Sequence, residues 1–261
     1  GPAAAAARVA RLRDTGQDVV IKVRSSAGGT GNLRLTTAML SGLGLAQIHA
    51  LIIGRLRAIG WAGAYPILVG VWERGVTQSP SAQVFIPLDA PPIVEGLFEQ
   101  RVAGAEGEFV GAIPAVLPRP IGETMRDEAT RLASVLQALG YFGWCSFDGI
   151  LRDDETLHWI ECNGRWSGVS IPLVATMNMI GHVPGGIAIA QDHIERGTLA
   201  FDRLLDRLDD LLFRKRQGGP GLVLTSPQNP AAAALSFNAV AVADDQATAE
   251  AILTDARDRL R

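Results

Sequence analysis

Two segments near the middle of the chain constrain its fold most, because both have the composition of β-strands and both carry carboxylates. They are GWCSFDGIL, residues 143–151, and HWIECNGRWSG, residues 158–168. Aromatic and aliphatic residues dominate both, and the polar run 152–155 between them is typical of a turn. The sequence therefore predicts a β-hairpin.

The faces of this hairpin suggest a metal site. Because side chains alternate along a strand, Glu161 and Asn163 should point the same way, and a turn centred on residues 154–155 places Asp148 opposite Glu161. Facing carboxylates about 5 Å apart repel each other, which a fold tolerates on a wet face or around a cation. With the Asn163 amide they form an all-oxygen set that suits Mg²⁺ or Mn²⁺. Arg165 follows, placed to meet an anion; the alternative is an ordinary polar surface hairpin.

Composition sets broad limits on the protein class. The chain has 261 residues, 48% of them hydrophobic, enough for one large domain or two lobes. Its net charge of −3 and the absence of a long basic tract disfavour nucleic acid as a partner. Cys145 and Cys162 are expected to pack as buried free thiols on the hairpin face opposite the carboxylates, with no disulfide framework or zinc site.

The sequence predicts neither a membrane span nor a secretory signal. Polar and charged residues interrupt the longest apolar region, 38–72. The Ala-rich N-terminus carries three arginines by residue 13 and has no apolar core. A cytoplasmic protein without a membrane partner is therefore expected.

A glycine-rich loop near the N-terminus is a candidate phosphate-binding feature. Asp18–Arg24 reads as a strand, Ser25–Gly31 (SSAGGTG) as a loop, and Asn32–Thr36 as extended again. The glycines thus join strand to strand, unlike either common phosphate motif, in which a helix follows the glycines. Backbone N–H groups of such a loop can approach phosphate oxygens, and Lys22 on the incoming strand adds a charge. The alternative is a mobile hairpin with one exposed Lys.

The remaining segments alternate between helical and extended patterns. Glu99 and Arg101 alternate out of a predicted strand on one face and belong either to a site or to a solvated pair. Residues 77–81 read as a turn. Helices are expected over 3–15, 43–58, 120–140, 172–181, 186–196, 201–215 and 247–260. Further strands are expected over 65–73, 83–86, 97–102, 108–115, 221–225 and 236–243.

This order of elements resembles an ATP-grasp domain over roughly residues 5–195. The features that carry the resemblance are VVIKVRSSAGGTGN, an apolar strand ending in Glu, a long helix and the two hairpin segments. Within the hairpin, the pattern Asp-x₁₂-Glu-x-Asn-x-Arg is similar to the family's metal-and-phosphate signature. It implies an α+β fold whose two lobes have antiparallel sheets and hold ATP between them, plus a small C-terminal β-β-α appendage. The lobes would span 1–72 and 73–196, and the helix and appendage 197–261.

The resemblance also implies nucleotide-binding residues in the first part of the chain. Lys22 would contact the ATP phosphates. The hinge strand 67–73 would pair with adenine through its backbone, including Val71, and Glu73 would lie at the ribose. The flexible lid over the phosphates would consist of Gly28, Gly29, Thr30 and Gly31.

In the second part, the resemblance assigns the hairpin to metal and catalysis. Asp148, Glu161 and Asn163 would hold Mg²⁺ (or Mn²⁺) against the β- and γ-phosphates. Arg165 would steady the transferred phosphoryl group or an acyl phosphate, so Arg165 and Lys22 are the expected catalytic residues. Positioning and charge neutralisation dominate phosphoryl transfer, which fits a chain without an evident Ser-His-Asp arrangement.

The implied activity is ATP-dependent carboxylate–amine ligation, ADP-forming, through an acyl phosphate. ECNGRWSG followed by VSIP, and the SPSAQ segment, are similar to the branch that includes bacterial peptide ligases, so amino acid or peptide substrates are expected. A non-catalytic ATP-binding regulatory or assembly module and an ATP-grasp phosphotransferase stay open as alternatives.

Two departures from the family pattern qualify the resemblance. Many members have a cationic residue where this chain has Ser146, two positions before the metal Asp, and Arg165 would have to supply that charge. The family usually has a preceding α/β domain, whereas this sequence starts at the nucleotide-binding lobe. Three alternatives stay open: an N-terminal domain is missing from this sequence, that domain lies on a partner chain, or the protein works without it. A homodimer stays open as well.

Overall fold

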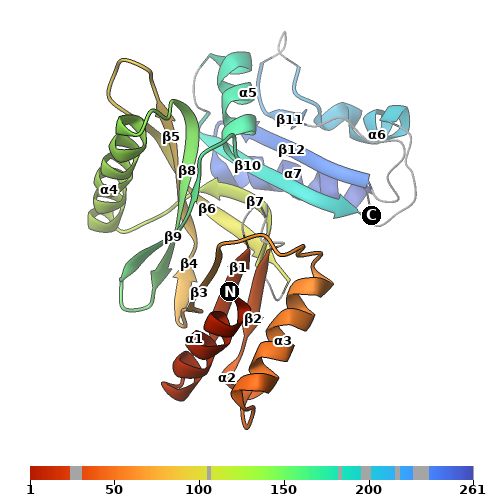
Figure 1. Cartoon of the computed structure of the whole chain (residues 1–261). Helices are drawn as coiled ribbons and strands as arrows, with labels where there is room; N and C mark the ends of the chain where they lie inside the picture. Colours follow the sequence, from red (N-terminus) through yellow and green to blue (C-terminus); the bar gives the residue numbers. More distant parts are fainter. Residues whose placement is uncertain are drawn as a thin grey trace. The chain divides into compact units, whose positions relative to one another are not determined.

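The computed structural model describes residues 1–23, 31–104, 107–181, 184–194, 201–214, 218–225 and 235–260. The chain forms two compact units, the first made of residues 1–75 and 102–109 and the second of 76–101 and 110–261. Both contain antiparallel sheets with helices packed against them (Figure 1). The expected mixture of helices and antiparallel strands is confirmed.

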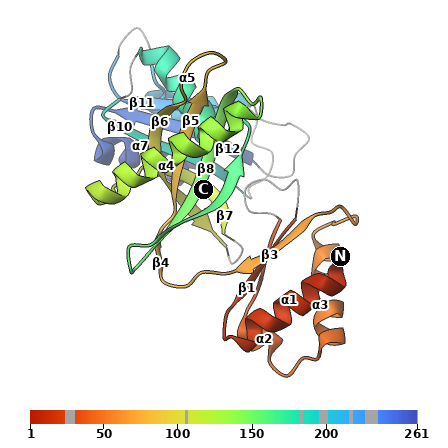
Figure 2. The ribbon, with the colours of Figure 1, turned by 60° about the vertical axis from the view of Figure 1, so that its left-hand side comes forward.

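The first unit is a three-stranded antiparallel sheet covered on one face by two helices (Figure 2). Val19 and Ile21 are completely buried beneath those helices, so Val20 and Lys22 belong to the opposite face. The strand order is β2-β1-β3, which makes β3 an edge strand. The elements are α1 (Pro2–Asp14), β1 (Val19–Val23), β2 (Asn32–Leu35), α2 (Thr37–Leu40), α3 (Leu45–Ala58) and β3 (Ile67–Val71).

A buried carboxylate joins the ends of these strands. The backbone N–H of Thr37 donates to Asp18 Oδ1 at 2.9 Å, and the guanidinium groups of Arg34 and Arg74 donate to its two oxygens at 3.1 and 3.0 Å. The Asp18 side chain is only 7% exposed. The Thr37 N–H, helped by the two guanidinium groups, lowers the pKa of Asp18 to about 2.

We expect Asp18→Asn to destabilise the first unit by about 1–2 kcal/mol at pH 7, because the amide keeps the Thr37 contact but loses the charge that attracts two arginines. A carboxyl whose folded-state pKa is depressed stabilises the fold above its unfolded pKa of about 4 and ceases to do so as the pH falls through about 2. Urea unfolding at pH 7 and pH 2 should therefore show a difference between variant and wild type only at pH 7. Asp14→Asn, at an exposed pair with Arg13, is the control with little expected effect.

The second unit contains one long antiparallel sheet. Its strand order is β11-β12-β10-β7-β6-β5-β8-β4, and β9 pairs with β8. The first strands are β4 (Val76–Gln78), β5 (Pro80–Ile86), β6 (Ile93–Ala103), β7 (Glu108–Pro114), β8 (Gly143–Arg152) and β9 (Leu157–Asn163). The last strands are β10 (Gly186–Ile194), β11 (Gly221–Leu224) and β12 (Leu235–Ala243).

Helices divide this sheet into two packed regions. The first is covered by α4 (Arg119–Ala138), whose Met125, Ala129 and Ala133 are completely buried against β5 and β8. At the other end, α6 (Phe201–Leu208), η1 (Asp209–Leu211) and α7 (Gln246–Leu260) share a core with β10, β11 and β12. Between them, α5 (Ser170–Ile180) contacts β12.

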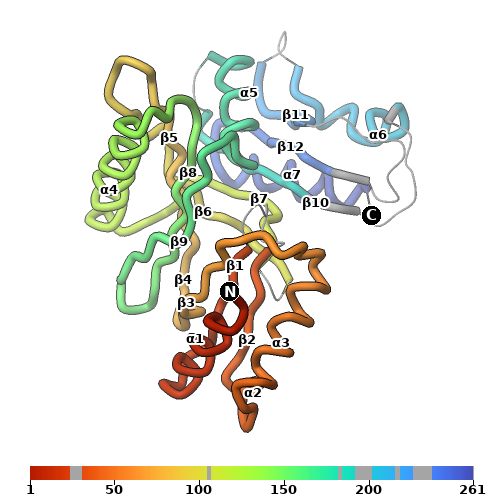
Figure 3. Tube along the Cα trace, in the orientation of Figure 1, coloured from red at the N-terminus to blue at the C-terminus, as the bar shows by residue number. Residues whose placement is uncertain are grey.

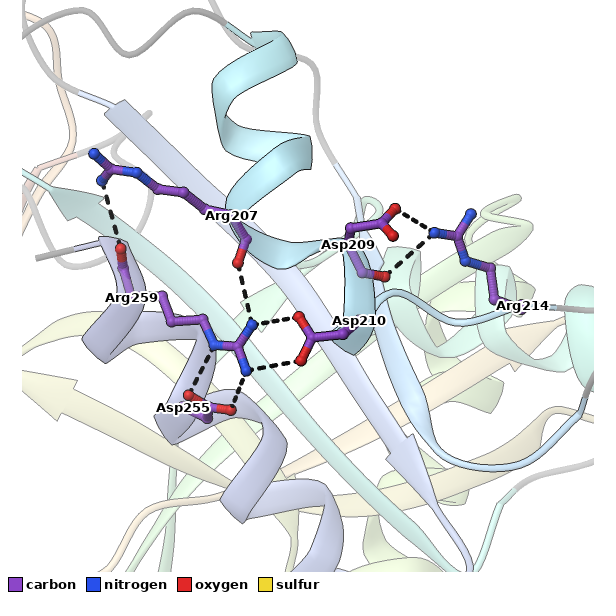
Figure 4. A network of polar contacts seen from close by, with 6 residues as sticks. All are labelled: Arg207, Asp209, Asp210, Arg214, Asp255 and Arg259. Atoms are coloured by element: carbon purple, nitrogen blue, oxygen red, sulfur yellow. Dashed lines mark hydrogen bonds and ion pairs between the residues drawn. The ribbon is translucent and has the colours of Figure 1, made fainter.

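An arginine on the C-terminal helix ties α7 to η1 (Figure 4). Arg259 donates to both oxygens of Asp255, one turn earlier on α7, at 2.9 Å, and forms an ion pair with Asp210. Its guanidinium also donates to the Arg207 carbonyl at 3.2 Å. These contacts, together with the shared apolar core, place α6 and η1 against α7.

Two local expectations are wrong. Residues 77–81 do not form a turn: Thr77 and Gln78 belong to β4, and Pro80 and Ser81 belong to β5, which pairs with both β6 and β8. Residues 186–196, expected to be helical because of their alanines, contain β10, which pairs with β12 over nine residue pairs. Ala188 and Ala190 are at most 2% exposed there, so their small side chains fit the strand beneath the helices; tertiary pairing overrides helix propensity.

The C-terminal segment 197–261 contributes to the long sheet of the second unit, because β12 pairs with β10 and β11 pairs with β12. Within the described ranges, no helix combines the length and the apolar character needed to cross a bilayer.

Candidate metal and phosphate site

The β8–β9 hairpin has the predicted register at the end that carries the candidate ligands. Asp148 pairs with Glu161, and Ser146 pairs with Asn163. Since paired residues share a face, Asp148, Glu161 and Asn163 lie on the same side of the sheet. Figure 3 follows the chain from β8 through the turn into β9 and on to α5.

A one-residue bulge produces this register. Gly149 pairs with Trp159 while Asp148 pairs with Glu161, so β9 contains one extra residue, Ile160. The turn is centred on residue 154, half a residue earlier than expected, since Leu151 pairs with Leu157. The bulge compensates for that difference and brings Glu161 opposite Asp148.

The bulge also sends two nearby side chains of β9 to opposite faces. The Trp159 ring packs edge-on against Phe147 in the core beneath α4, with ring centroids 6.2 Å apart, and its Nε1 donates to Glu128 at 2.7 Å. Glu161 lies on the other face, beside Asp148. A β-bulge commonly re-aims side chains at a functional site, and here it separates a core anchor from a candidate ligand.

Asp148 is held by hydrogen bonds from two neighbours. Ser81 Oγ donates to its Oδ1 at 2.6 Å, and Asn163 Nδ2 donates to its Oδ2 at 2.9 Å. Arg165 is exposed, and its guanidinium donates to Asn163 Oδ1 at 3.0 Å and to the Trp166 carbonyl at 3.1 Å. A carboxylate, an amide and a guanidinium therefore follow one another along the site.

The donor chemistry of this set fits Mg²⁺. Two carboxylates and an amide offer oxygen ligands only, the type that Mg²⁺ prefers. Within the part of the chain that the structure describes, His, Cys, Asp and Glu form no metal-binding cluster of three or more. Asn163 turns its NH₂ toward Asp148 and its oxygen toward Arg165, the orientation that satisfies both neighbours. Rotating the amide by half a turn would present its oxygen beside the Asp148 carboxylate, as a hard cation requires.

Serine and glutamine side chains support the site from inside the protein. Ser81, Gln83, Ser146 and Ser170 are at most 1% exposed. Ser81 pairs with Asp148, and Gln83 pairs with Ser146, so these residues share the face of the candidate metal ligands. The sequence does not mark Ser81 and Gln83 as site residues, although their alternation in PSAQ is a strand signal beside the proline.

An aromatic row continues this face toward the end of the sheet. The rings of Phe85 and Trp144, paired across β5 and β8, are 5.5 Å apart, and Trp144 and Trp166 are also 5.5 Å apart. Trp166 is 47% exposed. A partly exposed ring next to Arg165 can contact a substrate that approaches the guanidinium.

The expected behaviour of the cysteines is correct only in part. Cys145 is buried, and burial raises the pKa of its thiol to about 12. Cys162 is exposed, because β9 lies at the margin of the sheet and pairs with β8 alone. Neither forms a disulfide.

Glu99 and Arg101 have separate partners rather than forming one solvated pair. Glu99 accepts the backbone N–H of Ser79 at 2.8 Å, and burial raises the pKa of its carboxyl. Arg101 forms an ion pair with Glu250 of α7. Both contacts join elements of the second unit, which is a structural role.

The expected nucleotide residues belong to the first unit. Lys22 is on β1, where it pairs with Asn32 and Leu68. Val71 ends β3, and Glu73 lies two residues beyond it. The expected lid is described only at Gly31, whose carbonyl accepts the Val23 N–H at 3.1 Å. Gly28, Gly29 and Thr30 lie outside the described residues.

No family model and no curated protein matches this sequence. Solved structures do match its fold. A biotin carboxylase from Campylobacter jejuni in complex with a β-γ-ATP ligand has a TM-score of 0.67 at 14% identity, covering 95% of this chain and 58% of that one.

Two further structures agree. An N5-carboxyaminoimidazole synthase from Aspergillus clavatus, with ADP and an aminoimidazole ribonucleotide, has a TM-score of 0.62 at 12% identity over 98% of this chain and 65% of that one. The biotin carboxylase domain of a Hydrogenobacter thermophilus 2-oxoglutarate carboxylase, with MgADP and bicarbonate, has a TM-score of 0.62 at 14% identity over 96% of this chain and 58% of that one. The chain thus spans roughly three fifths of the length of the proteins that it resembles.

Proposed function

Because this chain has the ATP-grasp fold, we propose that it is an ATP- and Mg²⁺-dependent carboxylate–amine ligase. One observation carries the proposal: Asp148 and Glu161 face each other on one side of the sheet, with the Asn163 amide and the Arg165 guanidinium in contact beside them. Two carboxylates, an amide and an exposed guanidinium supply the charges that a metal-bound phosphate chain requires.

In this proposal the hairpin binds and orients the reacting phosphate. Asp148, Glu161 and Asn163 would hold Mg²⁺ through oxygen atoms. A Mg²⁺ ion held there would supply positive charge against the negative charge that develops on the phosphates during transfer. Arg165 lies two residues past Asn163 and faces the transferred group, and a guanidinium can bind two phosphoryl oxygens at once.

The first unit is proposed to bind the rest of the nucleotide. Lys22 contacts the phosphates from the sheet face opposite α1 and α3, together with the glycine loop that ends at Gly31. The backbone of β3 is suited to adenine, because an edge strand presents N–H and C=O groups beyond its pairing with β1. Val71 is proposed to pair with adenine through its backbone, and Glu73 is proposed to lie at the ribose.

The proposed reaction has two steps. A substrate carboxylate oxygen attacks the γ-phosphorus of ATP, the bond to the β–γ bridging oxygen breaks, and ADP leaves with an acyl phosphate formed. An amine nitrogen then attacks the acyl carbon, inorganic phosphate leaves with the carbon–oxygen electron pair, and the nitrogen loses a proton to give the amide. Neither step needs a protein nucleophile, so the required side chains are those that place and neutralise charge.

The donor carboxylate is proposed to be small, with amino acids or peptides as the first class to test. Bicarbonate belongs in the same screen, because one of the similar proteins was solved with a bicarbonate anion. The exposed Trp166 next to Arg165 favours substrates with an apolar group beyond the carboxylate.

The test is ADP and phosphate release with Mg²⁺-ATP, measured with carboxylates alone, with amines alone and with both. A ligase releases ADP and phosphate together, and only when both substrates are present. ADP release with a stable phosphorylated product and no amine requirement would instead identify a phosphotransferase. ATP binding without ADP release under every condition would contradict an enzymatic role and favour a binding module.

A further inference from the structure

A continuous line of hydrogen bonds runs through the interior from the segment that follows Arg165 to the Asp148 carboxylate. Ser167 Oγ donates to Gln83 Oε1 at 2.8 Å, Gln83 Nε2 donates to Ser81 Oγ at 2.8 Å, and Ser81 Oγ donates to Asp148 Oδ1 at 2.6 Å. Gln83 has no exposed surface, and Ser81 is 1% exposed.

The direction of this line follows from the chemistry of its members. Ser81 has one hydroxyl proton, and an ionised Asp148 can only accept, so the short contact between them requires that proton to point at the carboxylate. The NH₂ of Gln83 donates to the hydroxyl oxygen from the other side, which leaves the Ser81 proton directed at Asp148. With the amide reversed, its oxygen would compete with Asp148 for that proton.

The same amide holds the segment that carries Arg165. Its oxygen accepts from Ser167 Oγ, and Ser167 exchanges contacts with Ser170 at the start of α5: Ser167 N donates to Ser170 Oγ at 2.7 Å, and Ser170 N donates to Ser167 Oγ at 3.0 Å. A buried amide without hydrogen-bond partners would cost free energy. Because both the oxygen and the NH₂ of Gln83 have a partner, the orientation of this amide is fixed.

We propose that Gln83 is a positioning residue that orients the metal-binding carboxylate of Asp148 through Ser81 and, from the same amide, anchors the Arg165 segment through Ser167. The inference rests on the proposed function, because it assumes that Asp148 is a metal ligand. Hydrogen-bond partners behind a ligand fix its orientation, and their loss commonly lowers metal affinity 10- to 100-fold.

The test is Mn²⁺ binding to the whole protein, measured from the free Mn²⁺ signal by electron paramagnetic resonance, with Mn²⁺ alone and with Mn²⁺ plus ADP. Gln83→Met keeps similar volume but removes both polar ends of the amide, and we expect at least about tenfold weaker Mn²⁺ binding. Gln137→Met is the matched control: its amide donates to the carbonyls of Pro87 and Ala90 at 2.7 and 2.8 Å, away from the line.

A second variant separates positioning from general packing. Ser81→Ala removes the group through which Gln83 acts, so it should weaken Mn²⁺ binding by itself, and adding Gln83→Met should weaken it little further. If Gln83→Met does not fold, the Mn²⁺ affinity of Ser81→Ala alone tests the inference.

The outcomes are distinct. Weaker Mn²⁺ binding in Gln83→Met and Ser81→Ala, with wild-type binding in Gln137→Met, supports the inference. Wild-type Mn²⁺ affinity in both network variants overturns it while leaving the proposed function intact. If the wild-type protein binds no Mn²⁺ with or without ADP, the metal site itself is wrong, and the inference fails with it.

Discussion

Glu161→Gln is expected to abolish Mg²⁺-dependent ATP turnover, a loss of at least about a thousandfold, while the protein stays folded. A neutral amide at this position removes one of the two carboxylates that face each other on β8 and β9. A thousandfold loss corresponds to roughly 4 kcal/mol in the barrier, the size of effect that removing one preorganised charge can have on an electrostatically driven transfer. Glu161 is exposed, so the same change should hardly alter the free energy of unfolding.

Initial rates of ADP release and circular dichroism measure the two effects. Glu155→Gln is the matched control, because it makes the same chemical change on an exposed residue in the turn of the same hairpin and should retain wild-type rates. Wild-type turnover in Glu161→Gln would remove Glu161 from the metal set.

Gly111→Ala is expected to have the largest effect on stability, about 3 kcal/mol or more. Gly111 is on β7 where that strand pairs with β10, and a Cβ there would lie 2.1 Å from the backbone carbonyl oxygen of Ile189. Its φ of +152° is also unfavourable for residues with a side chain. Because backbone cannot rotate out of the way as a side chain can, the two halves of the sheet would have to separate locally.

Urea unfolding compares this variant with Gly122→Ala, the same change within α4. There the nearest heavy atom to a new Cβ is 4.0 Å away, and alanine should be neutral or stabilising by up to about 1 kcal/mol. Equal stability of Gly111→Ala and wild type would show that β7 and β10 do not pair as closely as the structure has them.

The β8–β9 hairpin could be predicted from the sequence because its information is local. Residues 143–163 contain a strand pattern, a polar turn and carboxylates at a spacing that one register brings together. The bulge at Ile160 could not be predicted, since it depends on Trp159 packing into the core beneath α4. The expected register was correct because the bulge offset the half-residue error in the turn.

Features set by long-range pairing were the ones missed. β10 reads as a helix because alanine favours helices, and only its pairing with β12, more than forty residues later, makes it a strand. Ser81 reads as the end of a turn for a similar reason, and the face that Ser81 and Gln83 share is defined only by pairing with β8. The role of Gln83 follows only from its hydrogen bonds to Ser81 and Ser167, which the sequence alone does not show.

The thermal unfolding midpoint, recorded with and without millimolar Mg²⁺-ATP, tests most directly whether nucleotide and metal bind at the hairpin. A ligand that binds only the folded state raises the midpoint by mass action. We predict a rise that requires both Mg²⁺ and ATP in the wild-type protein and that is absent in Glu161→Gln. No rise in the wild type, or an equal rise in Glu161→Gln, would contradict a metal-nucleotide site at Asp148 and Glu161.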